Sequence, residues 1–302
     1  MKIEIRRLRQ LIDSSHRSEA LFQLIAMDSL IQLIVEEVRQ VEGVKAIVLG
    51  GSRARGTQTS TSDIDLGIYY HPNSPLDVKT LGKIATKLDD AHRADVITGI
   101  GGWGPWINGG GWLRVQGHPV DFLYRDLAKV TTLIDDCLQG NVEIVYQPGH
   151  PLGFVSSMYL AEVAACQSLW DPEGIIAELK RKVDPYPDSL QNALIQKFAW
   201  EINFSIDIAR KSIQRSDVTY AAGCCFRCVM CMLQVLFAIN RTHWLNEKGA
   251  VALAETFPRK PARLGRRIEA TFQLLDAKPE SIRGAIANLE GLSKEIDALI
   301  LE

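Results

Sequence analysis

The chain has 302 residues, of which 46% are hydrophobic and 23% charged, and its formal net charge is -2. This balance is that of ordinary globular proteins, which excludes a disordered or low-complexity chain. It also argues against a strongly basic nucleic-acid binder and against an acidic solubilising tail. The length exceeds that of one typical domain, so we expect two domains.

The cysteines and the apolar segments point to a cytoplasmic protein. Four of the six cysteines lie between Cys224 and Cys231, which is a poor layout for a disulfide framework and fits a reducing compartment. The first ten residues carry charges with no apolar core behind them, so we do not expect a secretory signal. The longest apolar stretch, Cys224 to Ile239, is shorter than a bilayer requires. We therefore expect no membrane partner.

The first half of the chain predicts a mixed α/β unit. In chain order, the patterns predict a helix over 15–42, strands over 44–51 and 62–70, a helix over 75–91, a strand over 94–98, a loop over 99–111, a β-hairpin over 112–124 and a helix over 125–138. The loop is rich in glycine and tryptophan, and Gly117 joins the two arms of the hairpin. Because hairpins and helices are interleaved, we expect a small mixed sheet of about five strands.

The second half predicts an all-α helical bundle. Helical periodicity runs over 156–170, 173–183, 188–215, 218–240, 249–256, 261–275 and 279–301, with proline and glycine at the breaks. We place the domain boundary near 148–153, which gives an N-terminal α/β domain over 1–150 and a helical domain over 151–302.

The turn that follows the first predicted strand has the features of a phosphate-binding site. Gly50 and Gly51 let backbone N–H groups approach a ligand closely, and the short helix that begins after them favours phosphate oxygens. Ser52 adds a hydroxyl donor, and Arg53 and Arg55 add positive charge. The turn is not a Walker A loop, because no Lys-Ser/Thr pair follows the glycine at the required spacing.

Three carboxylates follow this turn in the sequence. Asp63 and Asp65 are two residues apart on a predicted strand, so they share one face of the sheet, where their mutual repulsion is relieved by a divalent cation. Asp121 joins them if its strand lies beside theirs. Three carboxylates can hold two Mg²⁺ ions for an in-line phosphoryl displacement, with Asp121 as the general base or its metal-bound equivalent. Phosphates at Ser52 and a metal at the carboxylates together describe a nucleoside triphosphate site.

The motifs GGSRARG and SDIDL, followed by a distant Asp between apolar residues, resemble the nucleotidyltransferase superfamily of DNA polymerase beta over about residues 44–125. The nearest branches are the minimal nucleotidyltransferases and the aminoglycoside and lincosamide nucleotidyltransferases. The resemblance implies that Gly51 and Ser52 bind the β- and γ-phosphates and that Asp63, Asp65 and Asp121 bind two Mg²⁺ ions. It also implies that a helical C-terminal domain helps to bind the acceptor. The long glycine and tryptophan insert departs from the family pattern.

We therefore expect a nucleotidyltransferase that moves a nucleoside monophosphate from a triphosphate, ATP in our interpretation, to an acceptor hydroxyl and releases pyrophosphate. A small acceptor, as in the antibiotic-modifying relatives, is our first choice. One alternative is modification of tRNA or of a protein, as in the toxin–antitoxin relatives. A second alternative is a nucleotide-binding regulator without turnover.

Three further features carry two interpretations each. Trp103, Trp106 and Trp112 in and beside the loop either pack it onto the core or form a rim that stacks on substrate. The cysteines at 225, 228 and 231 have metal-like spacing, but their apolar surroundings favour core packing. The basic run over 259–267 favours a solvated helix face, with phosphate contacts to an RNA acceptor as the alternative.

Overall fold

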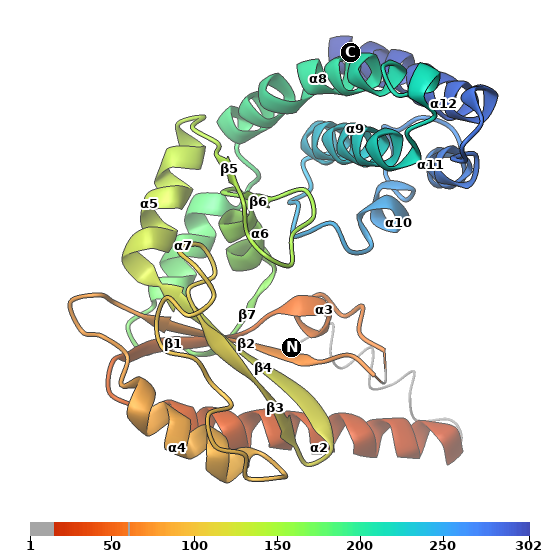
Figure 1. Ribbon diagram of the computed structural model, residues 1–302. Helices are drawn as coiled ribbons and strands as arrows, with labels where there is room; N and C mark the ends of the chain where they lie inside the picture. Colours follow the sequence, from red (N-terminus) through yellow and green to blue (C-terminus); the bar gives the residue numbers. More distant parts are fainter. Residues whose placement is uncertain (1–14, 60) are drawn as a thin grey trace. The chain divides into compact units, whose positions relative to one another are not determined.

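The computed structural model describes residues 15–59 and 61–302 (Figure 1). The charged stretch at the N-terminus, residues 1–10, lies outside the described residues. The chain forms a mixed sheet with helices, followed by a helical region, which confirms the expected fold class. Contacts divide it into two compact units, one comprising residues up to Ala128 together with Ala165–Ala177 and the other Lys129–Ala164 together with Glu178–Glu302. Compared with a single boundary at 150, this division assigns residues 129–150 to the second unit and residues 165–177 to the first.

The first unit is built on a five-stranded sheet with the order β3-β4-β2-β1-β7. The strands are β1 (Val44–Leu49), β2 (Ile64–Tyr70), β3 (Gly110–Val115), β4 (His118–Asp126) and β7 (Gln167–Trp170). Strands β2 and β4 run parallel, and the other neighbours run antiparallel. The β3–β4 hairpin turns at Gln116 and Gly117, both with positive φ, as expected for a tight hairpin turn.

Helices α2 (Ser15–Val38) and α4 (Val78–Leu88) supply the core on one face of this sheet. Figure 1 shows both helices along the same side of the strands. Ile34, Ile47, Ile64 and Phe122 are fully buried in the shared core. Because side chains alternate along a strand, the residues between these core positions point to the other face, which carries the polar groups described below.

The expected strand over 94–98 is not formed. An isolated β-bridge between Ile97 and Gly111 and hydrogen bonds of Thr98, such as that from its N–H to the carbonyl of Gly110 at 2.7 Å, connect this segment to the sheet. His92 and Asp95 have positive φ, so the chain turns twice and passes β3 at one point instead of running beside it. The close approach requires a glycine, since a Cβ at Gly111 would stand 2.5 Å from the carbonyl oxygen of Val96.

The expected helix over 156–170 divides into a helix and a strand. Helix α6 covers Met158–Ala165, and the next residues form β7, which pairs antiparallel with β1 through Ile47 and Trp170. Leu169 and Trp170 pack against the core of the first unit. Strand pairing at the open side of β1 therefore outweighs the helical pattern, and it supplies the fifth strand of the sheet.

The second unit is mostly helical. Its elements are α5 (Leu127–Leu138, which leaves β4 directly), β5 (Ile144–Val145), β6 (Phe154–Val155), α6, α7 (Ile175–Val183), α8 (Asp188–Arg210), the 3-10 turn η1 (Ile213–Arg215), α9 (Val218–Ile239), α10 (Ala250–Ala254), α11 (Leu264–Gln273) and α12 (Pro279–Leu301). The expected helices are therefore present with shorter bounds, and the pair β5–β6 was not expected. Helix α9 is central, because it packs against α8, α10, α11 and α12.

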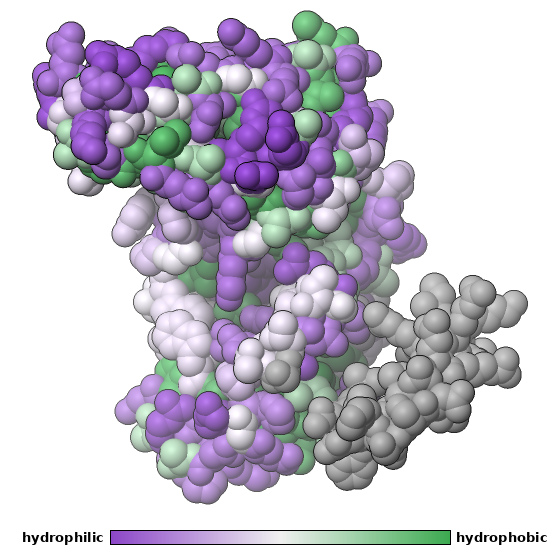
Figure 2. Space-filling model, turned by 90° about the vertical axis from the view of Figure 1, so that its right-hand side faces the viewer, coloured by the Kyte–Doolittle hydropathy of each residue, from purple (hydrophilic) through white to green (hydrophobic). Residues whose placement is uncertain are grey.

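Helix α9 is the one described helix that is long and apolar enough, by length and composition, to cross a membrane. Its 22 residues exceed the apolar stretch recognised in the sequence, and 72% of its most apolar window is buried in the structure. This degree of burial is typical of a helix in the core of a folded domain. On the face of the helical unit that is visible in Figure 2, the side chains are mainly polar.

A buried carboxylate fixes the outer strand of the sheet. Asp89, at the end of α4, is fully buried and accepts hydrogen bonds from the Arg93 guanidinium and from the backbone N–H of Arg114 in β3. These bonds hold the pKa of Asp89 well below its usual range. The adjacent Asp90 accepts from the N–H groups of Gln116 and Gly117 in the hairpin turn. Two neighbouring carboxylates thus cap the free edge of β3.

We expect Asp89→Ala to lower the free energy of unfolding by about 2–3 kcal/mol, because the N–H of Arg114 and the Arg93 guanidinium lose their shared, buried acceptor. Urea unfolding at neutral pH measures this loss. The matched control is Asp90→Ala, whose bonds lie at an exposed turn, and there we expect a loss below about 1 kcal/mol. Equal losses in the two variants would contradict the anchoring role of Asp89.

Candidate active site

Two of the three predicted carboxylates lie side by side in the sheet. The parallel register of β2 and β4 pairs Asp65 with Asp121. Paired residues point to the same face, and Leu66 and Phe122, one position on, are buried on the opposite face. Asp63 precedes β2 by one residue and is exposed, two positions before Asp65. The geometry therefore brings the three carboxylates to one end of two neighbouring strands.

The electrostatics of this pair are unfavourable in the absence of a cation. Burial, followed by the negative charges of Asp65 and Asp63, raises the pKa of the Asp121 carboxyl to about 7. Like charges this close disfavour a second ionised carboxyl. A carboxyl that titrates near neutral pH is well suited to accept a proton in catalysis.

The donor set fits a divalent metal ion. Mg²⁺ prefers oxygen ligands, and a cation between the carboxylates would relieve the repulsion that raises the pKa of Asp121. Within residues 15–59 and 61–302, no group of three or more His, Cys, Asp or Glu side chains is already arranged around a metal position. The fit to the metal thus rests on the chemistry of the carboxylate oxygens.

The predicted phosphate turn lies against Asp65. The N–H of Gly50 donates to the carbonyl of Asp65 at 2.8 Å, and α3 (Gly51–Ala54) begins directly after it. Gly51 has φ +59, and a Cβ added there would stand 1.8 Å from Asp65 Oδ2. Only a glycine lets the backbone of the turn approach the carboxylate this closely. The turn and the carboxylate pair thus meet at one end of the interior strands β1, β2 and β4.

The two arginines of the turn bond to the protein backbone. Arg53 donates from Nε to the carbonyl of Asp63 at 2.9 Å and from Nη2 to the carbonyl of Ser62 at 2.6 Å. Arg55 donates from Nε to the carbonyl of Gly51 at 3.3 Å. Arg53 therefore holds the segment before β2 against α3, a positioning role that the sequence pattern did not indicate. Direct contact of either arginine with phosphate remains a prediction, as it does for the half-buried Ser52.

The tryptophans border the same face. Trp112 in β3 pairs with Asp121 in β4, so its side chain shares the face of the carboxylates. Its ring stacks on Trp103 with 4.5 Å between centroids and 24° between planes. Trp112 is nevertheless 60% exposed, and Trp106 is half-buried in the preceding loop. The structure brings two of the three predicted rim residues together beside Asp121.

The cysteine cluster lies inside the helical unit. Cys225, Cys228 and Cys231 are fully buried in α9, and all three are free thiols. Burial raises the pKa of Cys225 to about 11 and that of Cys231 to about 12. Buried neutral thiols behave as small apolar side chains, which supports the core-packing interpretation.

Three cations of the basic run are paired within their own unit. Lys260 lies 3.2 Å from Glu255, and Arg267 donates to Glu295 at 2.6 Å. Arg259 donates to the carbonyl of Leu299 at 2.7 Å. Much of the positive charge in this run is therefore engaged at the surface of the helical unit.

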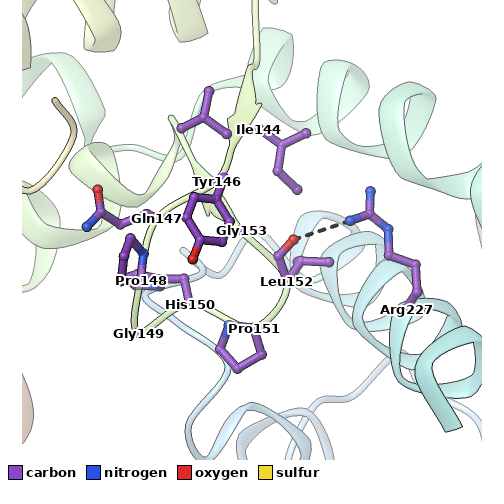
Figure 3. Close-up of a pocket in the computed structure, with 11 residues that line it drawn as sticks. Ile144, Tyr146, Gln147, Pro148, Gly149, His150, Pro151, Leu152, Gly153 and Arg227 are labelled. Carbon is purple, nitrogen blue, oxygen red and sulfur yellow. Dashed lines mark hydrogen bonds between the residues drawn. The ribbon is translucent and has the colours of Figure 1, made fainter. Parts of the chain in front are cut away.

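A separate cavity of about 510 Å³ opens in the helical unit (Figure 3). Residues 144–153 form most of its wall, and Arg227 of α9 reaches it from the far side, where it donates to the carbonyl of Leu152 at 3.2 Å. The guanidinium is bound by both carboxylate oxygens of Glu201, and His150 Nδ1 lies 3.4 Å from Glu247. The carboxylates near this cavity, Glu201 and Glu247, face Arg227 and His150. In the sheet site, by contrast, carboxylates face one another.

Comparison with known proteins gives two family matches. Residues 31–102 match a family described as a nucleotidyltransferase domain, and residues 154–248 match a domain of unknown function, DUF4037. A crystal structure of a nucleotidyltransferase-like protein from Exiguobacterium sibiricum 255-15 is similar over 89% of this chain and 74% of its own length, with 12% identity and a TM-score of 0.43. No curated protein matches the chain. The first match contains the turn and β2 but ends before Asp121.

We expect Gly51→Ala to displace the Asp65 carboxylate and to weaken triphosphate binding by roughly tenfold or more, since the new methyl group occupies the position of Oδ2. Isothermal titration with a non-transferable triphosphate analogue and Mg²⁺ measures the change. Gly50→Ala is the matched control, because a Cβ there meets its nearest atom at 3.6 Å. Equal affinities for the two variants would contradict the close contact.

We expect Asp121→Asn to stabilise the metal-free protein at pH 8 by about 1–3 kcal/mol. The folded pKa of Asp121 lies above the unfolded value, so the wild type binds more protons when folded, and its stability falls as pH rises from about 4 to about 7. Urea unfolding in EDTA over this pH range tests the trend. Added Mg²⁺ should then stabilise the wild type and not the variant, whereas the same pH dependence in both proteins would argue against the shift.

Proposed function

Since this chain carries a domain of the nucleotidyltransferase superfamily, we propose that it transfers a nucleoside monophosphate from a nucleoside triphosphate to an acceptor hydroxyl and releases pyrophosphate. The observation that carries the proposal is the contact between the turn and the carboxylate pair. Asp65 touches Gly51 on one side and is paired with Asp121 on the other. A phosphate bound at the turn would therefore extend over the carboxylates.

Each group has a defined part in the proposed reaction. The N–H groups of the Gly50–Ser52 turn and the start of α3 bind the outer phosphates, which become the pyrophosphate. Asp63, Asp65 and Asp121 would hold Mg²⁺, in our proposal two ions, which when bound supply Lewis acidity and neutralise charge on the phosphates. Asp121 accepts the proton of the acceptor hydroxyl. Arg53 keeps the backbone of Asp63 in place through the two carbonyl bonds of the preceding segment.

A small-molecule acceptor agrees better with the charges than RNA does. Phosphate contacts need cations that are available to the ligand, and three of the five cations in the run 259–267 bond within the helical unit. A protein acceptor and a regulator without turnover are the remaining alternatives. A carboxylate array that repels itself at neutral pH favours a catalyst over a simple binding module. The choice of ATP and a cytoplasmic location are part of the same proposal.

We expect Asp65→Asn to reduce transfer of label from α-labelled ATP to below about one hundredth of the wild-type rate, because it removes a charge that the reaction requires. Asp63→Asn should also abolish transfer. The assay supplies the small molecules of a cell extract, bulk tRNA or extract protein as acceptor, and it separates the products by size. The matched control is Asp95→Asn, an exposed residue with positive φ that asparagine also adopts readily. Wild-type turnover in Asp65→Asn would contradict the proposal.

A further inference from the structure

The order of the strands places the functional groups in a row. From β1 to β3 across the sheet, the row runs from the Gly51 turn to Asp65, then Asp121 and then Trp112. Neighbouring strands are about 4.8 Å apart, so each group is one strand spacing from the next. The row therefore has a phosphate end at the turn and an aromatic end at Trp112.

In-line displacement gives this row a direction. The attacking oxygen approaches the phosphorus from the side opposite to the leaving pyrophosphate. In the proposed function the pyrophosphate leaves at the turn, beyond Asp65, so the acceptor hydroxyl comes from the direction of β4 and β3. The side chain beyond Asp121 in that direction is Trp112.

The Trp112 ring is held in place with much of its surface open. Trp103 stacks on the ring, and a Cβ at Gly110 would lie 2.9 Å from Trp103, so the partner ring lies tightly over β3. The backbone of Trp112 is also fixed, because Arg93, itself bound to the buried Asp89, donates to the Trp112 carbonyl at 3.2 Å. Arg114 shares this face, but its guanidinium bonds to the carbonyl of Gly117 in the hairpin turn. Even with Trp103 stacked on it, Trp112 is 60% exposed.

We infer that Trp112 is the stacking platform for the acceptor, and that the acceptor is a molecule whose reactive hydroxyl belongs to, or adjoins, a ring with a flat apolar face. Aromatic rings and the C–H faces of sugar rings both fit such a surface. The nucleobase is not the stacking partner of Trp112. The nucleoside is attached to the phosphorus off the axis that joins the attacking oxygen to the leaving pyrophosphate. This assignment rests on the proposed nucleotidyl transfer and adds the class of acceptor to it.

The test follows the indole N–H signal of Trp112 by NMR, assigned with Trp112→Phe. The protein is saturated with Mg²⁺ and an ATP analogue that carries a methylene group between the α- and β-phosphates. Phenyl glucoside and methyl glucoside are the ring probes, and sorbitol is the acyclic polyol. We expect both glucosides to shift the Trp112 signal saturably, and we expect sorbitol and the analogue alone to leave it unchanged.

Variants separate stacking from folding. Trp112→Ala should weaken glucoside binding at least about fivefold and leave analogue affinity unchanged, whereas Trp112→Phe should retain both. Trp200→Ala is the control, since Trp200 is 61% exposed in α8 and lies in the other unit. Loss of analogue affinity in Trp112→Ala, or glucosides that leave the signal unmoved, would overturn the inference. If Asp65→Asn binds the analogue as tightly as the wild type, the proposed function itself fails, and the inference fails with it.

Discussion

The parallel pairing of β2 with β4 is the constraint on which the candidate site depends. Asp65 and Asp121 are far apart in the sequence, and this register makes them direct neighbours. Two carboxylates in this position repel each other, so the pairing is held by apolar contacts on the opposite face, where Leu66 and Phe122 are buried. The core therefore stabilises an arrangement that the charges alone would oppose, as is common where a protein binds a metal or an ionic substrate.

The division between the two faces explains how a small sheet serves both stability and chemistry. Alternate residues of β2 and β4 enter the core with α2 and α4, and between these core positions Asp65 and Asp121 are only partly buried. The supporting bonds come from outside these two strands. Arg53 holds the segment before β2, and Asp89 and Asp90 hold β3 and its turn. The positions of the carboxylates and of Trp112 are thus supported by groups on other segments of the chain.

Much of this arrangement could be predicted from the sequence, because it follows from local pattern. The alternation of polar and apolar residues predicts β2 and β4, and the paired glycines predict the turn. An Asp flanked by apolar residues, as in β4, indicates a buried strand that presents one polar side chain to a site. Two features depend on tertiary contacts and were not predictable in this way. Residues 167–170 form a strand only because β1 offers an open edge, and the stacking of Trp103 on Trp112 depends on the close packing of an irregular loop. The Asp89 and Arg93 pair did leave a signal, since it has i, i+4 spacing at a helix end.

The return of β7 to the sheet makes the first unit discontinuous along the chain, with residues 129–164 inserted before its last strand. The sheet cannot be completed until the chain has passed through α5 and α6, so this pairing has a long sequence separation and belongs to the late events of folding. Until then β1 presents unpaired N–H and C=O groups along its outer side, a surface that invites pairing with other chains. A protein shortened to its first 150 residues would keep the proposed catalytic groups, but the outer side of β1 would stay unpaired and prone to pair with strands of other chains.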